Sequence, residues 1–193
     1  MKYKQWLGDI LTILLVIFLV LGINRFVVAP VVVSGVSMDY TLADGDSMLQ
    51  FKMASIDRFD VVVFPPPTGE KHNGKVKQYI KRVIGLPGDT IEFRDDRLYL
   101  NGVATIEPYL QGRLAEIPEE QRPFTRNFKV KEVVPEGKVF VMGDNRNRSK
   151  DSEEFGFVDI EVLTETSFIF YPFNKFGFLQ QYELNEAGMI VEK

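Results

Sequence analysis

The Ser37 side-chain hydroxyl is the first group in this sequence to consider as a nucleophile. Ser37 lies between the β-branched run 31–33 and a turn-forming stretch that contains Asp44 and Gly45. A residue at the end of a strand is well placed to expose its side chain. A free serine hydroxyl is a weak nucleophile, so Ser37 requires a general base within hydrogen-bonding reach. The sequence has no cysteine, which excludes thiol nucleophiles, disulfides and thiolate metal sites.

Two residues are candidates for that base. His72 is the single histidine, and it lies in a loop rich in proline and glycine, which would hold a base poorly. A Ser-His-Asp triad is therefore disfavoured. Lys81 has apolar neighbours in Ile80 and Val83, and burial among them would lower its pKa from ~10.4 toward the value of about 7–8 that a base needs. The alternative is that Lys81 and Arg82 are solvated charges on a strand.

A third polar segment, 143–152, reads Gly-Asp-Asn-Arg-Asn-Arg-Ser-Lys-Asp-Ser. Taken alone it is typical of a turn-rich loop. The spacing of its aspartates is loosely similar to a calcium loop, but the length and the terminal glutamate of an EF-hand are missing. We therefore predict neither a metal site nor a cofactor here.

The N-terminal segment predicts a membrane anchor. A helix over residues 7–28 would be about 33 Å long, enough to cross a bilayer of about 30 Å, and Lys2 and Lys4 precede it. By the positive-inside rule, residues 1–6 are expected in the cytoplasm and residues 29–193 outside it. The alternative is a cleaved signal peptide ending at Ala29, but Pro30 would then follow the cut, and its tertiary amide makes a poor scissile bond.

The rest of the chain predicts a mainly β domain. Strand patterns cover residues 31–33, 47–51, 60–64, 76–84, 90–94, 97–100, 133–142 and 167–171. Asp95-Asp96 and Asn101-Gly102 are predicted tight turns. Residues 111–129 are polar and carry Pro118 and Pro123, which indicates a small insertion or lid. The net charge of -4 argues against a nucleic-acid partner.

Four motifs in order give the sequence a family resemblance. They are Ser-Gly-x-Ser-Met-x-x-Thr-Leu at 34–42, Arg-Phe-Asp-Val-Val-Val-Phe at 58–64, Tyr-Ile-Lys-Arg-Val-Ile-Gly-Leu-Pro-Gly-Asp at 79–89, and Gly-Asp-Asn-Arg-x-x-Ser-x-Asp-Ser at 143–152. This ordered set resembles type I bacterial signal peptidase, the membrane-anchored serine protease with a Ser/Lys dyad. The single short anchor and small insertion are similar to the Gram-positive form. The resemblance runs from the anchor to about Tyr171.

The resemblance implies roles for individual residues. Ser37 would be the nucleophile, Lys81 the general base, and the Ser37 backbone N–H part of the oxyanion hole. Some relatives have a second serine donor two positions before the nucleophile; Gly35 occupies that position here, and Ser34 is one residue further away. Ser149 would hydrogen-bond to Lys81 and orient it. The bracing residues of the loop would be Asp144, Arg146 and Asp151, and the groove residues Gly35, Val36, Met38, Leu42, Gln78, Tyr79 and Ile80.

The implied substrates are preproteins, cut at the outer face of the cytoplasmic membrane without a cofactor. The signal peptide would bind as an added strand between the segments near Val33 and Gln78, with small side chains at the first and third positions before the cut. Ser47-Met48 also follows a glycine, but Thr41-Leu42 and then Gly45-Asp46 follow Ser37 in the family order. That order assigns the nucleophile to Ser37.

The sequence departs from the family pattern at two positions. Tyr40 replaces a proline that would rigidify the turn after Ser37, and Glu153 replaces an arginine that would pair with Asp151. Restoring Pro at 40 and Arg at 153 is therefore expected to preserve or raise activity. The departures also leave a second reading open: a homologue with little hydrolysis that binds extracellular proteins, for example in pilus assembly. The presence of both Ser37 and Lys81 favours the enzyme.

Overall fold

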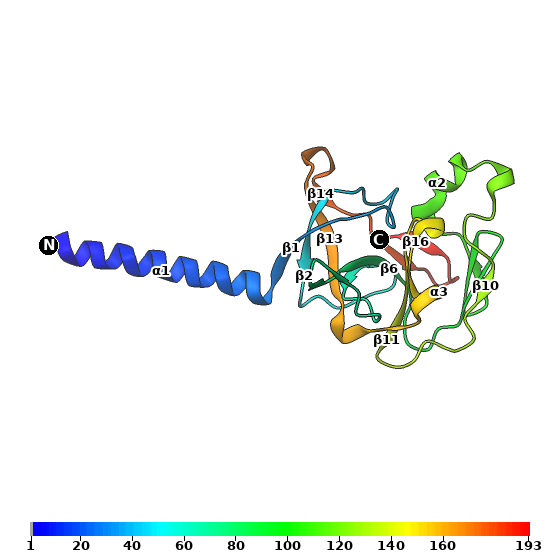
Figure 1. Ribbon diagram of the computed structural model, residues 1–193, viewed down its shortest axis with the longest axis horizontal. Helices are drawn as coiled ribbons and strands as arrows, with labels where there is room; N and C mark the ends of the chain where they lie inside the picture. Colours follow the sequence, from blue (N-terminus) through cyan, green and yellow to red (C-terminus); the bar gives the residue numbers. More distant parts are fainter. Residues whose placement is uncertain (1) are drawn as a thin grey trace.

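A long helix leads into a β-rich domain (Figure 1). The computed structural model describes residues 2–193, apart from the side chains of residues 2–5, 7, 24–26 and 72. The helix α1 (Lys2–Phe26) projects from the domain, and the apolar side chains of residues 10–21 that it carries are exposed. Within the described part of the chain, no helix has both the length and the apolar content needed to cross a membrane. The side chains of Lys2, Lys4 and His72, used above, lie outside the described residues.

The end of α1 corrects the predicted boundary of the anchor at residue 28. The helix ends at Phe26, and Val28 already belongs to the strand β1 (Val28–Val32). Pro30 restricts the residue before it to an extended backbone, which favours a strand over further helix. In β1, Pro30 pairs with Leu49 at the edge of a sheet, where the missing N–H is tolerated.

The main sheet holds eight strands with antiparallel pairing. Its order is β1, β2 (Ser47–Phe51), β13 (Thr164–Tyr171), β3 (Val61–Phe64), β6 (Tyr79–Gly85), β11 (Lys138–Met142) and β12 (Val158–Asp159), and β14 (Gly177–Phe178) pairs with β13. Every residue of β6 is buried. Lys81 and Arg82 therefore do not lie on a solvated strand, and their side chains point to opposite faces of the sheet.

A second sheet has the order β10 (Phe128–Lys129), β7 (Ile91–Arg94), β8 (Arg97–Leu100) and β9 (Val103–Thr105). The predicted turn at Asp95-Asp96 joins β7 to β8, and both residues have positive φ, as a type I′ hairpin requires. The predicted turn at Asn101-Gly102 likewise joins β8 to β9. Phe93 from this sheet and Phe140 from the main sheet belong to one buried cluster, which joins the two sheets.

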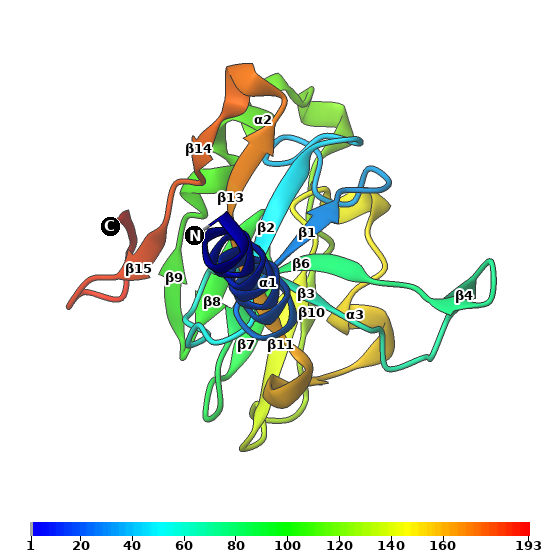
Figure 2. The ribbon, with the colours of Figure 1, turned by 90° about the vertical axis from the view of Figure 1, so that its left-hand side faces the viewer.

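Shorter elements complete the domain. They are the hairpins β4 (Lys71–His72) with β5 (Lys75–Val76) and β15 (Tyr182–Leu184) with β16 (Ile190–Glu192), the helices α2 (Gln111–Glu116) and α3 (Ser152–Phe155), and the 3-10 turns η1 (Pro108–Leu110), η2 (Glu119–Gln121), η3 (Arg146–Arg148), η4 (Ile160–Val162) and η5 (Phe173–Lys175). The β4–β5 hairpin extends away from the domain beside β6 (Figure 2).

Two predicted strands were too long. The segment 76–84 divides into β5 and β6, because residues 77 and 78 leave the hairpin before the buried strand begins. The segment 133–142 becomes a strand only at Lys138, after the turn that contains Pro135. The predicted insertion 111–129 starts as α2 and η2, and its last two residues form β10 on the second sheet.

Candidate active site

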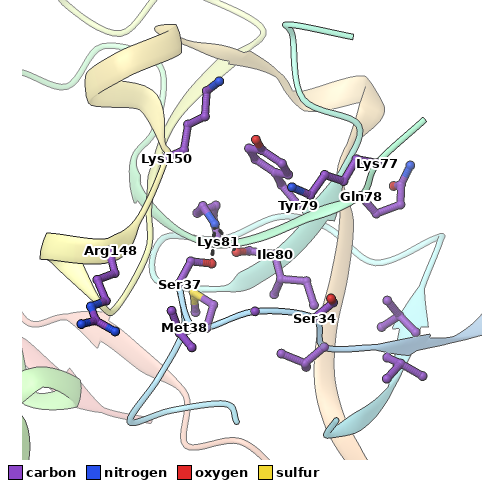
Figure 3. Close-up of a pocket in the computed structure, with 15 residues that line it drawn as sticks. Ser34, Ser37, Met38, Lys77, Gln78, Tyr79, Ile80, Lys81, Arg148 and Lys150 are labelled. Carbon is purple, nitrogen blue, oxygen red and sulfur yellow. Dashed lines mark hydrogen bonds between the residues drawn. The ribbon is translucent and has the colours of Figure 1, made fainter. Parts of the chain in front are cut away.

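Ser37 and Lys81 meet at one end of a groove (Figure 3). Ser37 lies five residues beyond β1, and Lys81 is the third residue of β6. The Lys81 Nζ donates a hydrogen bond of 2.7 Å to the Ser37 Oγ and another of 2.9 Å to the Ile80 carbonyl oxygen. This is the contact that a nucleophile and its base require.

Burial changes the protonation of Lys81. The residue is 3% exposed, and removal from water lowers the pKa of its ammonium from 10.5 to about 8. The negative charges of Asp151 and Asp144 raise the pKa and so limit the fall, whereas Lys77 lowers it further. A lysine with this pKa is partly neutral near physiological pH, as a general base must be.

Asn145 holds the backbone on both sides of the Ser37 side chain. Its Nδ2 donates a 2.9 Å hydrogen bond to the Val36 carbonyl, and its backbone N–H donates a 3.0 Å bond to the Ser37 carbonyl. No role was predicted for Asn145 from the sequence, although this residue lies inside the fourth motif. The spacing of residues along the chain offered no signal for a contact across more than a hundred positions.

The loop 143–149 approaches Ser37 closely. A Cβ placed on Gly143 would lie 2.5 Å from the Ser37 carbonyl oxygen, so only glycine fits without a shift of the backbone. The Ser149 side chain packs against Gly143. Its Oγ is buried and has no hydrogen-bond partner among the described residues, so the expected bond from Ser149 to Lys81 is not formed here. A Cβ on Gly143 would also meet the Ser149 Oγ, so this hydroxyl lies against Gly143.

Two buried ion pairs fix this loop to the rest of the domain. Asp144 accepts hydrogen bonds of 2.9 and 2.6 Å from Arg82, on the face of β6 opposite to Lys81, and Thr41 donates to the same carboxylate. Arg146 pairs with Glu107, just before the insertion. Asp144 joins the loop to β6 and, through Thr41, to the turn after Ser37. Arg146 joins it to Glu107 and, by a 3.1 Å hydrogen bond to the Thr125 hydroxyl, to the insertion. The sequence reading missed Arg82, Thr41 and Glu107, because only the fold brings these distant residues together.

The structure revises the interpretation of Tyr40. Its φ is +88°, which proline cannot adopt because its ring fixes φ near −65°. The guanidinium carbon of Arg113, on α2, lies 4.3 Å from the centre of the Tyr40 ring. The turn after Ser37 is therefore held by a contact from the insertion, and a proline would not fit this backbone.

The interpretation of Glu153 changes as well. Asp151 does not lack partners, because it accepts hydrogen bonds of 3.2 Å from the backbone N–H groups of Gly143 and Glu153, the second as the N-cap of α3. The Glu153 carboxylate instead pairs with Arg126 of the insertion at 3.0 Å. Both departures from the family pattern thus contact an arginine of the segment 111–129.

The groove gathers most of the predicted substrate-binding residues. Its lining comes from residues 31–38, from residues 77–81, and from Arg148 and Lys150. Leu42 is an exception: it is 1% exposed and packs with Met38 and Met48 in the core beneath the nucleophile turn. It supports the turn from below and is not available to a substrate. Ser47 lies in β2, outside the groove lining.

A buried, partly neutral lysine bonded to a serine at the end of a groove is the kind of site that a serine peptidase with a lysine base needs. Comparison with known proteins agrees with this class. The family model described as "Signal peptidase, peptidase S26" matches residues 4–171. The chain belongs to this family, so the predicted resemblance is confirmed.

Named relatives cover most of the chain. Signal peptidase IB of Staphylococcus aureus is 36% identical over 188 residues, which cover 90% of this chain and 92% of that protein. Signal peptidase I of Bacillus licheniformis is 42% identical over 170 residues, which cover 84% of this chain and 87% of that protein. A crystal structure of a signal peptidase I from Enterococcus faecalis is 39% identical, with a TM-score of 0.50, and covers 57% of this chain and 94% of that one.

Proposed function

We propose that this chain is a serine endopeptidase that removes signal peptides from preproteins, with Ser37 as nucleophile and Lys81 as general base. Family membership and the named relatives support the peptidase activity and the class of substrate. The observation that carries the assignment of residues is the 2.7 Å hydrogen bond between a lysine of lowered pKa and a serine at the end of the groove.

The chemistry follows from this pair. Neutral Lys81 accepts the proton of the Ser37 hydroxyl as its oxygen attacks the scissile carbonyl. The tetrahedral intermediate collapses to an ester on Ser37, and Lys81 gives the proton to the departing amine of the mature protein. Lys81 then takes a proton from water, which attacks the ester. The signal peptide leaves with a new carboxyl group, and Ser37 recovers its proton from Lys81.

The Ser37 backbone N–H is the proposed donor to the oxyanion. In a trans peptide the N–H points away from the preceding carbonyl. Asn145 holds the Val36 carbonyl, so the Ser37 N–H is fixed on the side of that peptide away from Asn145. The Gly35 N–H is already bound to the Asp44 carboxylate at 2.8 Å, so it is not available as a second donor, and exposed Ser34 is a candidate for that role.

The groove supports binding of an extended substrate. Residues 31–34 and 77–80 line it and lead to Ser37. A peptide lying between them can form a strand by backbone hydrogen bonds, while its side chains enter pockets at alternate positions. We infer that small side chains at the first and third positions before the cut are preferred, as the family resemblance implies.

Two pairs of variants test the assignment. Cleavage of a signal-peptide substrate should be lost in Ser37→Ala but kept in Ser47→Ala, which removes the other serine of a Ser-Met pair. Lys81→Ala and Lys81→Arg should both be inactive, because arginine keeps its charge at working pH and cannot act as a base. Full activity in Lys81→Arg would refute the proposed mechanism. No contact among the described residues favours the alternative of a binding protein with little hydrolysis.

We also propose that the whole N-terminal segment, including the residues of α1 whose side chains lie outside the described part, anchors the domain to the cytoplasmic membrane, with a single pass and the N-terminus in the cytoplasm. The exposed apolar side chains of residues 10–21 support association with lipid, because water would contact them otherwise. The full chain should sediment with membranes, and a chain that starts at Val27 should not. Protease added outside intact cells should digest the β domain. A full chain found mainly in the soluble fraction would contradict this proposal.

A further inference from the structure

The loop that carries Ser37 is closed at its base by two backbone hydrogen bonds. The Val33 N–H donates a 2.8 Å bond to the Asp46 carbonyl, and the Gly45 N–H donates a 3.0 Å bond to the Val33 carbonyl. The residues between these bonds, 34–44, include Ser37. The position of the Ser37 hydroxyl therefore depends on how firmly the second leg of the loop is held against the first.

The Asp46 carboxylate holds that second leg. One of its oxygens, Oδ2, accepts a 2.9 Å hydrogen bond from the Ala43 N–H and a 2.8 Å bond from the Lys175 Nζ. Asp46 is 3% exposed, and Lys175 is the cation that pairs with it among the residues that the structure describes. Removing one partner of a buried ion pair leaves the other charge without compensation, which is strongly unfavourable. Asp46 without Lys175 is therefore expected to turn or move toward water.

Lys175 reaches Asp46 from a turn that is itself fixed. The turn η5 follows β13, and it is packed onto that strand by two aromatic side chains. The rings of Phe176 and Phe178 lie edge-on to the ring of Phe168 in β13, with centroids 5.1 and 4.9 Å apart. The ammonium group of Lys175 thus ties the Ser37 loop to the main sheet across 129 positions of sequence.

The wall of the groove does not depend on this tie. Val32 lines the groove and pairs with Ser47 of β2, so ordinary sheet hydrogen bonds hold it in place. The loop beyond Val33 has no such neighbouring strand, and there the contact from Asp46 takes over. Loss of the Lys175 contact should therefore displace Ser37 more than the segment that faces the substrate.

We propose that Lys175 is a positioning residue for the peptidase reaction. By pairing with Asp46 it holds the base of the loop 34–44 closed, and this keeps the Ser37 Oγ at the Lys81 Nζ. The inference rests on the proposed function, because it takes Ser37 as the nucleophile. Lys175 does not touch the reacting atoms, so it acts on the rate of attack rather than on the affinity for the substrate.

Kinetics of the full-length enzyme in detergent test this role with a signal-peptide substrate. Lys175→Met should lower kcat roughly tenfold or more, because a small displacement of a reacting group costs a large part of the rate. KM should stay within about twofold of the parent value, because the lost interaction serves the reacting geometry and not binding. Lys175→Arg should recover most of kcat, since a guanidinium also pairs with a carboxylate.

Lys138→Met is the matched control. The side chains of Lys138 and Lys175 are 38% and 37% exposed, and each pairs with one aspartate. The partner of Lys138 is Asp159, whose side chain is 62% exposed and lies outside the groove lining. This variant therefore removes a lysine and an ion pair without leaving a buried charge, and it should keep the parental kcat.

A double variant assigns the effect to Asp46. Asp46→Asn removes the negative charge, while its amide oxygen can still accept the Ala43 N–H. In that background Lys175→Met should change kcat much less than it does in the parent, because the two residues act as a pair. Lys175→Gln keeps a donor for Asp46 without the charge, and it replaces Lys175→Met in both comparisons if that variant does not fold.

Three outcomes would overturn the proposal. Parental kcat in a folded Lys175→Met enzyme, with folding checked by urea unfolding, would remove the positioning role and leave the proposed function intact. An equal loss of kcat in the parent and in the Asp46→Asn background would show that Lys175 does not act through Asp46. A rise in KM at unchanged kcat would make Lys175 a substrate-binding residue instead. No cleavage by the parent enzyme would remove the proposed function, and the positioning role with it.

Discussion

The protonation of Lys81 should govern the activity of the enzyme as the pH is changed. Burial lowers the pKa of Lys81 to about 8, and only its neutral form can accept the proton of Ser37. We expect kcat/KM to rise through about pH 8 and then to level off. Asp151→Asn should move this rise to lower pH, because the negative charge of Asp151 raises the pKa of Lys81.

The structure sets the size of the effect. At pH 7, a pKa of about 8 leaves roughly one Lys81 in ten neutral, whereas the ordinary value of 10.5 would leave roughly one in three thousand. The lowered pKa therefore increases the neutral fraction of Lys81 at pH 7 roughly three-hundredfold, which is equivalent to about 3 kcal/mol. This is an upper limit on the loss of rate at pH 7 for any variant that only restores the ordinary pKa.

The assay is cleavage of a signal-peptide substrate between about pH 6 and 10, measured as kcat/KM because this ratio reports the free enzyme. Asp159→Asn is the matched control. Asp159 is exposed and pairs with Lys138, and it is not among the groups that influence the pKa of Lys81. Asn at 151 retains an oxygen that can accept the backbone N–H of Glu153, so the cap of α3 can persist.

Three results would refute the reasoning. A midpoint near 10 in the parent would mean that burial does not lower the pKa of Lys81. A rise that moves to higher pH in Asp151→Asn would contradict the sign of the charge effect. A rise that disappears in His72→Ala, while Lys81→Arg remains active, would assign the base to His72.

Four further predictions follow from the same contacts. Lys81→Met should raise the free energy of unfolding at pH 7 by up to about 3 kcal/mol, as measured by urea unfolding. Because the pKa of Lys81 is lower in the folded state, the unfolded parent chain binds more protons than the folded one between about pH 8 and 10.5, and the parent gains stability as the pH rises through that window. The difference in stability between variant and parent should therefore shrink there. Tyr40→Pro should lower kcat by roughly tenfold or more, because proline cannot adopt a φ of +88°; parental kcat would contradict this. Arg113→Ala should lower kcat by roughly two- to fivefold through loss of its contact with the Tyr40 ring, with partial rescue in Arg113→Lys. Glu153→Arg should lower stability by less than about 1 kcal/mol, because it places two cations together where Glu153 now pairs with Arg126, and thermal unfolding would measure the change.

The sequence alone predicted the class of fold, and its family resemblance predicted Ser37 and Lys81 as the reactive pair. Alternation and turn residues predicted most strands, and the Asp95-Asp96 turn was predicted from residues that tolerate positive φ. These features are local, so a single stretch of sequence carries them. The assignment of Ser37 over Ser47 depended on the order of the motifs, which is also a property of the sequence.

Tertiary structure decided what surrounds the pair. No local pattern could distinguish a buried Lys81 from a solvated one, because burial depends on the strands placed on either side of β6. The same holds for Asn145 on Val36 and Arg113 on Tyr40, which join residues distant in the sequence. Proline at position 40 was expected to help because its effect on a turn is general, whereas the sign of φ at that position is set by packing. The sequence specifies the type of each side chain, but the pKa and the partners of that side chain depend on the groups that the fold places beside it.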